Sequence, residues 1–245
     1  MDITLPLALL GGLSPTAFMQ TYWEKQPLLV RAALPGMTPL LGRAELLALA
    51  ASDAIESRLV SRSGQAGASD WVFKRGPFAR RALPAFRQSH WTLLLQGMDL
   101  QHPGVHALLQ RFRFVPDARL DDVMISYATD GGGVGPHFDH YDVFLLQVQG
   151  QRRWRYGRQS DQTLVAGLPL KILAHFEPEF DEVLNPGDML YLPPHWAHDG
   201  VALGECMTYS VGFRAPGRAE LAAQLLTRLA DAADDWAGAA VYRDP

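Results

Sequence analysis

Short apolar runs dominate the second half of the chain, and turn-forming residues separate them. The runs are VMISY, VFLLQVQ, RRWRY, DEVL, DMLYL and MTYSVGF, which all follow Asp121. They are rich in β-branched and aromatic residues and are broken by Gly, Pro and Asp, a pattern that predicts β-strands. Regularly spaced short strands of this kind indicate a barrel or a jelly roll.

Apolar residues at helical spacing flank this β region on both sides. Near the start, Ser14 and Pro15 are typical of a helix N-terminus, with Phe18, Tyr22 and Trp23 expected to face inward. The predicted ranges are 14–25, 42–52, 90–98 and 103–112 for helices, 26–31 for a strand and 61–70 for a flexible hairpin tip. After the β region, an Ala- and Leu-rich stretch predicts one long helix, or two.

Charge and cysteine content narrow the classes of function. The net charge is −4 and no block of Lys and Arg occurs, so the electrostatic footprint of a general nucleic-acid binder is missing and no direct nucleic-acid partner is expected. The single cysteine, Cys206, cannot form an internal disulfide, which suits a reducing compartment. The first residues lack the pattern of a signal peptide, and no run reaches about 18 apolar residues. We therefore expect a cytoplasmic protein without a membrane partner.

The stretch GGGVGPHFDHYDVF carries the most informative chemistry. Its glycine-rich loop leads into His137, Phe138 and Asp139 and then into an apolar run. In an extended strand, residues i and i+2 point to the same face, so His137 and Asp139 can converge while Phe138 faces away. An imidazole and a carboxylate placed in this way are suited to bind a metal ion.

A third ligand is expected from the later stretch NPGDMLYLPPHWAHDG. His198 is the preferred candidate, because NPGD predicts a turn into the strand MLYL and PPHWAH predicts a rigid loop that ends at His198. His195 in the same loop is the weaker alternative, and His140 points the wrong way to converge with Asp139. The other histidines, interpreted as capping, surface or core residues, are His90, His102, His106 and His175.

Two imidazoles and one carboxylate leave three positions free on a six-coordinate ion. This facial triad is associated with Fe(II) oxygenases, in which a 2-oxo acid can occupy two positions and dioxygen the third, so that the cofactor carries the redox chemistry. A structural zinc site would be four-coordinate and richer in cysteine than this chain allows. The expected cofactors are therefore Fe(II), 2-oxoglutarate as cosubstrate, and O2.

The run GQRRWRY offers a cation for the second carboxylate of such a cosubstrate. In a regular strand, Arg153 and Arg155 share one face, while Arg152, Trp154 and Tyr156 share the other. An arginine on the inner face needs an anionic partner, because burying it unpaired is costly, and a carboxylate would provide one. Parity alone leaves open which set faces inward.

These motifs resemble the bacterial ribosomal oxygenases, cupin-like JmjC proteins that use 2-oxoglutarate to hydroxylate an arginine of a large-subunit ribosomal protein. The resemblance rests on YWEKQPLLVR, ESRLVSR, KRGPF, DDVMISYATDGGGVGPHFDHYDVFLLQ, GQRRWR, PGDMLYLPPHWAHDG and YSVGFRAP. It spans most of the chain. It implies a mainly β fold with flanking helices, built around a double-stranded β-helix.

The resemblance also implies roles for individual residues. The implied iron ligands are His137, Asp139 and His198, in agreement with the spacing argument. Arg152 is assigned to the distal carboxylate of 2-oxoglutarate. Ser126 and Ser210 are implied as hydroxyl donors to the cosubstrate, and a purely structural role is an equal alternative for each.

Domains and partners follow from the same resemblance. Residues 1–120 are expected to pack on the barrel, residues 121–215 to form the double-stranded β-helix, and residues 216–245 to begin a helical dimerisation region. Family members continue beyond this region, so the short C-terminus argues against a homodimer. The implied substrate is an arginine of large-subunit ribosomal protein L-sixteen. The alternatives are another protein or small-molecule substrate, a non-catalytic metal-binding cupin, and a scaffold with a vestigial pocket.

Overall fold

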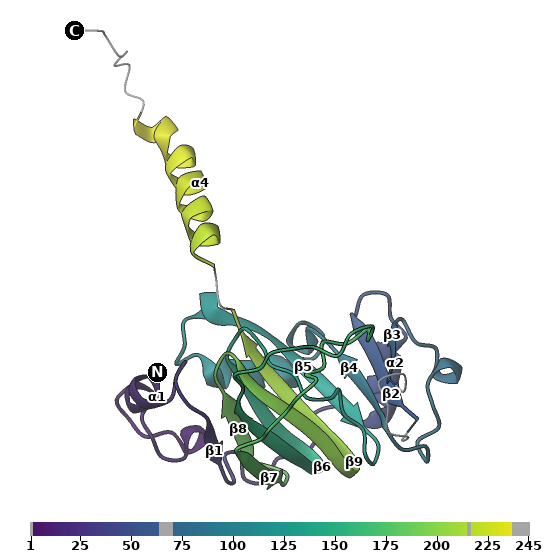
Figure 1. Cartoon of the computed structure of the whole chain (residues 1–245). Coiled ribbons are helices and arrows are strands. Elements are labelled where there is room, and N and C mark those ends of the chain that lie inside the picture. The colour runs from purple at the N-terminus through teal and green to yellow at the C-terminus, as the bar shows by residue number, and fades with distance from the viewer. Residues whose placement is uncertain (1, 64–70, 215–216, 237–245) are drawn as a thin grey trace, which may run out of the picture. The chain divides into compact units, whose positions relative to one another are not determined.

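Two long antiparallel strands, β6 (Val143–Arg158) and β9 (Trp196–Phe213), form the centre of the fold (Figure 1). The structure is a computed structural model that describes residues 2–63, 71–214 and 217–236. The register between the two strands shifts after Gln147 and again before Gln151, around Gly150 with φ 61°. Such β-bulges bend a strand, and each half of β6 therefore has its own surroundings.

The two halves of β6 pair with different neighbours. The first half pairs with β8 (Met189–Leu192) and the second with β7 (Phe180–Leu184). The other strands are β1 (Leu28–Val30), β2 (Ser57–Arg62), β3 (Trp71–Arg75), β4 (Trp91–Leu95) and β5 (Leu120–Ala128). They follow the order β1-β8-β6-β9-β5-β4-β2-β3. This is the mainly β architecture with flanking helices that the sequence predicts.

Aromatic side chains join the first helix to the sheet. Helix α1 (Pro15–Thr21) begins as predicted, because the Ser14 side chain accepts a hydrogen bond from a backbone N–H of the first turn. Phe18 is fully buried, and its ring centroid lies 5.6 Å from that of Phe144 and 5.0 Å from that of Tyr191. The helix ends four residues before the predicted end. The predicted inward orientation of Phe18 and Trp23 is confirmed, because both side chains are buried.

The remaining predicted helices of the N-terminal half differ in outcome. Helices α2 (Arg43–Ala50) and α3 (Pro103–Leu109) confirm two predictions, and His102 caps α3 by accepting backbone N–H bonds. The structure also contains short 3-10 helices at Ala8–Leu10, Arg80–Ala82, Met98–Leu100, Gln110–Phe112 and Asp117–Arg119. The helix predicted at residues 90–98 is wrong, because this segment contains β4.

Burial on both faces explains the error at β4. All five of its residues are buried, and the strand lies between β2 and β5. A strand covered on both faces loses the alternation of polar and apolar residues, so its sequence cannot be told from that of a buried helix. Similarly, VFLLQVQ and RRWRY were predicted as separate strands and are two halves of β6.

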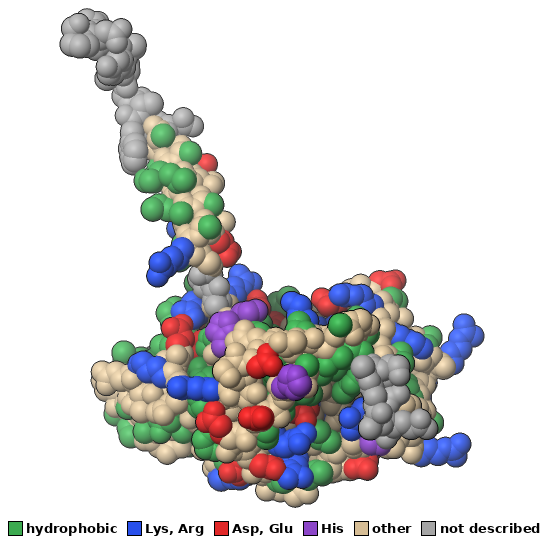
Figure 2. Space-filling view, viewed as in Figure 1, with side chains coloured by type: hydrophobic (Ala, Val, Ile, Leu, Met, Phe, Trp, Pro, Cys, Tyr) green, Lys and Arg blue, Asp and Glu red, His purple; other side chains and the backbone are tan. Residues whose placement is uncertain are grey.

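Two further predictions concern the ends of elements. The strands β2 and β3 pair antiparallel on either side of the predicted hairpin tip, but the tip itself, at residues 64–70, lies outside the described residues. After Arg214 the contacts define a second unit, in which α4 (Arg218–Trp236) confirms the predicted long helix. Figure 2 shows apolar side chains along α4. The exposed large apolar residues of this helix are Leu221, Leu225, Leu226 and Leu229. The dimerisation role implied for this region stays a prediction.

Within the ranges that the structure describes, none of the helices combines the length and the apolar character needed to cross a bilayer.

Candidate metal centre

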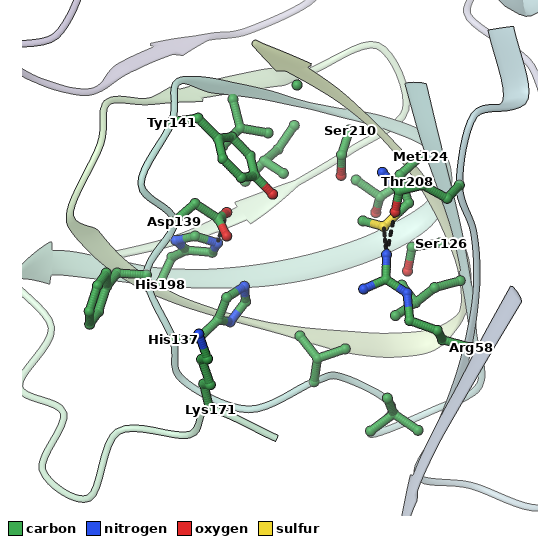
Figure 3. A pocket seen from close by; sticks show the side chains of 18 of the residues that line it. Arg58, Met124, Ser126, His137, Asp139, Tyr141, Lys171, His198, Thr208 and Ser210 are labelled. Carbon is green, nitrogen blue, oxygen red and sulfur yellow. Dashed lines mark hydrogen bonds and ion pairs between the residues drawn. The ribbon is translucent and has the colours of Figure 1, made fainter. Parts of the chain in front are cut away.

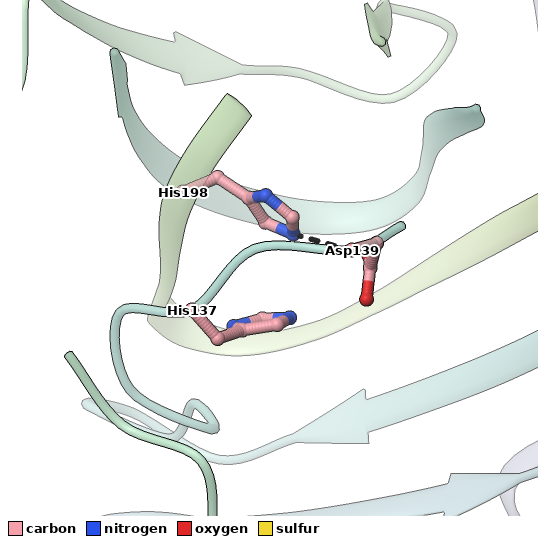
Figure 4. Close-up of side chains that lie close together, drawn as sticks. All are labelled: His137, Asp139 and His198. Atoms are coloured by element: carbon pink, nitrogen blue, oxygen red, sulfur yellow. Dashed lines mark ion pairs between the residues drawn. The ribbon is translucent and has the colours of Figure 1, made fainter. Parts of the chain in front are cut away.

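The three residues singled out by spacing meet in space. His137, Asp139 and His198 each offer one potential ligand atom, and these atoms all lie within 4.8 Å of one another (Figure 4). The Asp139 carboxylate lies 3.7 Å from Nε2 of His198, and the two imidazole centroids are 4.3 Å apart. The expected third position is therefore occupied by His198, and the alternative, His195, does not join the cluster.

Direct backbone pairing brings the two distant histidines together. The N–H of His137 donates to the carbonyl oxygen of His198 at 3.0 Å, and the N–H of His198 donates back to His137 at 2.7 Å. This isolated antiparallel bridge fixes the two side chains as cross-strand neighbours. His198 lies in β9, whereas His137 and Asp139 lie in an irregular segment before β6 rather than in a regular strand.

The glycine-rich loop reaches this bridge because it can lie directly on other backbone segments. A Cβ atom at Gly132 would lie 2.4 Å from the carbonyl oxygen of Trp91, and one at Gly133 would lie 2.6 Å from that of Gly200. Gly131, with φ 69°, adopts the left-handed conformation that glycine favours. Larger residues would push the loop away from β9 and displace His137.

Each histidine is oriented by a second hydrogen bond. Nδ1 of His137 lies 2.9 Å from the Gly135 carbonyl oxygen, and Nδ1 of His198 lies 3.0 Å from that of Trp196. A carbonyl oxygen only accepts, so Nδ1 carries the proton and Nε2 offers its lone pair. Burial, together with the neighbouring His137, lowers the pKa of His198 to about 4. The neutral imidazole required of a metal ligand is therefore favoured at neutral pH.

The donor set fits a divalent transition metal with open positions. Among the described residues, no cysteine, further histidine or second carboxylate joins the three ligands. Two neutral imidazoles and one carboxylate form the facial triad arrangement. Asp139 is 23% exposed at its side chain and His198 only 4%, so the cluster is buried on one side and open on the other.

The open side faces a pocket of about 500 Å³. Figure 3 shows the triad at one end and a group of polar side chains from β5 and β9 at the other. Ser126, Thr208 and Ser210 belong to that second group and line the pocket. Both serines named from the sequence therefore lie where a ligand that spans the pocket would reach them.

Arg152 lies at the polar end without a carboxylate. Its residue is 4% exposed, and its Nη2 donates to the Ser126 hydroxyl at 3.2 Å and approaches Sγ of the buried Cys206 at 3.6 Å. Its Nε has no hydrogen-bond partner. No acidic group of the described residues lies within 4.0 Å of this guanidinium. A buried cation in this state needs an anionic ligand.

The neighbouring arginines of β6 are already paired. Arg153 forms an ion pair with Asp181, and Arg155 lies 2.5 Å from the Asp199 carboxylate. Both arginines are about half exposed at their side chains, at 53% and 41%. The sequence left open which set of alternating residues in this strand faces inward. In the structure, Arg152 lies on the inner face, whereas Arg153 and Arg155 lie on the outer face.

Comparison with known proteins identifies the domain that contains this centre. Residues 107–221 match the model of the JmjC domain family. This part of the chain is a JmjC domain. Its motifs resemble the bacterial ribosomal oxygenases, as the sequence predicts, and the following relatives bear this out.

Two relatives share the JmjC domain and the region before it. The chain is 40% identical over 205 residues to the ribosomal protein uL16 3-hydroxylase of Escherichia coli K12, covering 83% of this chain and 53% of that protein. It is 35% identical over 224 residues to a probable ribosomal oxygenase of Haemophilus influenzae, covering 90% and 54%. The chain spans about half the length of the curated relatives it matches.

Solved structures show the same fold. An X-ray structure of Escherichia coli YcfD matches with a TM-score of 0.79 at 38% identity, covering 93% of this chain and 59% of that one. Another YcfD structure, in complex with cobalt and 2-oxoglutarate, matches with a TM-score of 0.77 at 37% identity, covering 95% and 59%. The jelly-roll fold of the JmjC domain is thereby confirmed.

Sequence reasoning missed several residues that line the pocket. They are Arg58, Asp122, Tyr141, Lys171 and Thr208. Strand parity could have identified Asp122, because it lies two and four residues before Met124 and Ser126, which also line the pocket. Burial raises the pKa of Asp122, and one of its carboxylate oxygens accepts bonds from Gln96 and the Gly97 N–H, both at 2.7 Å.

Proposed function

We propose that this chain is an Fe(II)- and 2-oxoglutarate-dependent protein hydroxylase whose iron is held by His137, Asp139 and His198. One observation carries the proposal. Arg152, a buried arginine without an acidic partner in the described part of the chain, lies in the same pocket as an open facial triad. A cosubstrate with a chelating 2-oxo acid at one end and a second carboxylate at the other matches both features.

The residues of the chain would orient this chemistry. When bound, the iron would supply the oxidising power by which 2-oxoglutarate and O2 become succinate, carbon dioxide and a hydroxylated C–H bond. The backbone carbonyls behind His137 and His198 keep both Nε2 atoms aimed at one point. Arg152, steadied by Ser126, would bind the distal carboxylate. Ser210 would add a hydroxyl hydrogen bond, and its place in the pocket supports this role.

An arginine side chain of a ribosomal protein is the substrate that we propose. A guanidinium entering the pocket would need a carboxylate, and Asp122 provides one on the wall of the pocket. Its bonds to Gln96 and Gly97 both use Oδ2, which leaves Oδ1 for a ligand. The similar Escherichia coli protein is named a ribosomal protein uL16 3-hydroxylase, which supports the same protein as the first substrate to test.

Mass spectrometry tests this function directly. The chain is incubated with Fe(II), 2-oxoglutarate, air and a uL16 peptide that contains the candidate arginine, and a peptide with lysine at that position is the matched control. We expect one added oxygen on the arginine peptide alone, together with one succinate per oxygen added. Binding of metal and 2-oxoglutarate without any succinate would instead indicate a binding protein of the cupin type. If oxygen were added to other proteins but not to uL16, the proposed substrate would be wrong, while the proposed type of reaction would still hold.

A further inference from the structure

Two histidines that the triad does not use lie beside it. The ring centroids of His140 and His195 are 4.9 Å apart, with an angle of 74° between the ring planes. Both residues are exposed, and His140 lines the rim of the pocket. Neither belongs to the triad, for which the sequence offered His195 as the weaker alternative and rejected His140. They form a second pair of imidazoles on the same side of the JmjC domain.

The surroundings restrict both rings. The ring of Phe138 lies 5.4 Å from that of His140 and 5.8 Å from that of His195, so one aromatic side chain contacts the pair. The N–H of His195 donates to the carbonyl oxygen of Asp139 at 2.8 Å, which ties the PPHWAH loop to the metal-ligand segment. Rings that are held in this way lose little freedom when they bind a ligand.

The backbone of His195 is itself unusual. Its φ is +66°, in the left-handed region that residues other than glycine seldom adopt. Conformations of this kind cost free energy and persist where the surrounding structure enforces them, often at functional sites. His195 is exposed, and its imidazole lies beside that of His140.

The spacing of the rings fits chelation of one ion. Two imidazole nitrogens that bind one ion at about 2.1 Å, at an angle between about 90° and 110°, place their ring centroids roughly 4.5–5.2 Å apart. The distance of 4.9 Å between His140 and His195 lies in this range. The ring centroids of the two triad histidines are 4.3 Å apart, just below this range.

We propose that His140 and His195 bind a second divalent transition-metal ion, of the class of zinc, nickel or copper, at the rim of the pocket. These ions prefer imidazole, whereas magnesium and calcium prefer oxygen ligands. Two protein ligands leave further positions for water or for a side chain of a bound partner. The ion would add positive charge at the mouth of the pocket and oppose entry of a cationic substrate. Only this last consequence rests on the proposed function.

Metal stoichiometry tests the proposal. The whole chain, stripped with a chelator, is dialysed against graded concentrations of zinc chloride, and the bound zinc is measured by mass spectrometry of the element. We expect two ions per wild-type chain and one in the double variant His140→Gln, His195→Asn, since asparagine tolerates positive φ. Each single variant should weaken the second site by about tenfold or more. His106→Gln, at an exposed histidine of α3, is the matched control and should keep two.

A second variant separates the two sites. Asp139→Ala should lose zinc at the triad and keep the ion at His140 and His195, while the double variant should show the reverse. Thermal melting of every variant checks that the fold is intact, and His140→Gln alone serves if the double variant does not fold. One zinc per wild-type chain, or a second zinc that survives in the double variant, would overturn the proposal. An absence of succinate formation would contradict the proposed function and leave these counts unchanged.

Discussion

The two ends of the pocket attract opposite charges. At one end, two neutral imidazoles and a carboxylate within 4.8 Å of one another favour a metal cation. At the other end, Arg152 is buried without an acidic partner among the described residues and favours an anion. Neither end alone specifies 2-oxoglutarate, because many proteins bind metals and many bind carboxylates. Their presence in one cavity favours a ligand that carries both a chelating group and a distal carboxylate.

Removing a ligand from the metal end should have the largest effect. We expect His137→Ala and Asp139→Ala to lose bound iron and to reduce 2-oxoglutarate turnover below detection, because each leaves only two protein ligands. The fold should persist, since both residues precede β6 and lie outside the buried core. Metal content and succinate formation are the measurements. Succinate produced at the wild-type rate by either variant would show that the triad is not the metal centre.

Removing the cation from the opposite end should have a smaller and different effect. Arg152→Ala would forfeit a charge-assisted interaction worth about 1.5–3 kcal/mol, so the 2-oxoglutarate requirement should rise roughly 10- to 150-fold while iron is retained. Arg153→Ala is the matched control, because Arg153 points away from the pocket and pairs with Asp181. The KM for 2-oxoglutarate, measured alongside iron content, distinguishes the two. Equal KM values for both variants would remove Arg152 from the cosubstrate site.

The pocket wall between the two ends offers a third test. We expect Asp122→Asn to raise the KM for an arginine peptide by about tenfold, because a carboxylate partner of the guanidinium is lost. The KM for 2-oxoglutarate should not change. Asp117→Asn is the control, since Asp117 is exposed, does not line the pocket and already pairs with Arg113. The measurement is steady-state kinetics in which the peptide and 2-oxoglutarate are varied separately. If Asp122→Asn altered only the KM for 2-oxoglutarate, the assignment of Asp122 to the substrate guanidinium would be wrong.

A buried carboxylate outside the pocket shows what burial costs when no ligand compensates for it. Burial raises the pKa of Asp142 to about 6, above the usual range of an aspartate, although the Tyr191 hydroxyl donates a hydrogen bond to it. The folded state therefore holds this proton more tightly than the unfolded state. The associated stability is complete below about pH 4 and is lost as the pH rises through about 6.

The smallest expected effect follows from this shift. Asp142→Asn should unfold at a temperature a few degrees higher than wild type at pH 7.5, because the amide removes the buried charge and keeps an acceptor for Tyr191. At pH 4 the difference should largely disappear. Melting curves across this pH range provide the check, and a variant that is destabilised equally at both pH values would contradict the sign of the shift.

Local spacing singled out the two segments that supply the three clustered side chains. His137 and Asp139 are two residues apart in an extended segment, and His198 ends a loop rigidified by proline. The pairing of His137 with His198 brings these segments together, and no local pattern specifies that register. The loop pattern favoured His198 and the family resemblance agreed with it, whereas the choice of Arg152 over Arg153 came from the resemblance alone.

The sequence was least informative where burial or long-range packing decides the structure. The strand β4 was predicted as a helix because burial on both faces removed its alternation. Arg58 reaches the pocket from β2, which was not predicted as a strand, and Lys171 reaches it from a loop between β6 and β7. Asp122 and Thr208 did carry a usable signal, through their parity with Ser126 on β5 and with Ser210 on β9.

The most direct test is a crystal structure from crystals grown without oxygen, with Mn(II) in place of Fe(II) and with 2-oxoglutarate. It tests whether one pocket binds a metal at the triad and a carboxylate at Arg152. We expect an anomalous peak about 2.0–2.2 Å from Nε2 of His137 and His198 and from an Asp139 oxygen. The same map should show the distal carboxylate against Arg152. A triad without metal, a fourth protein ligand that closes the ion, or a carboxylate away from Arg152 would contradict the account.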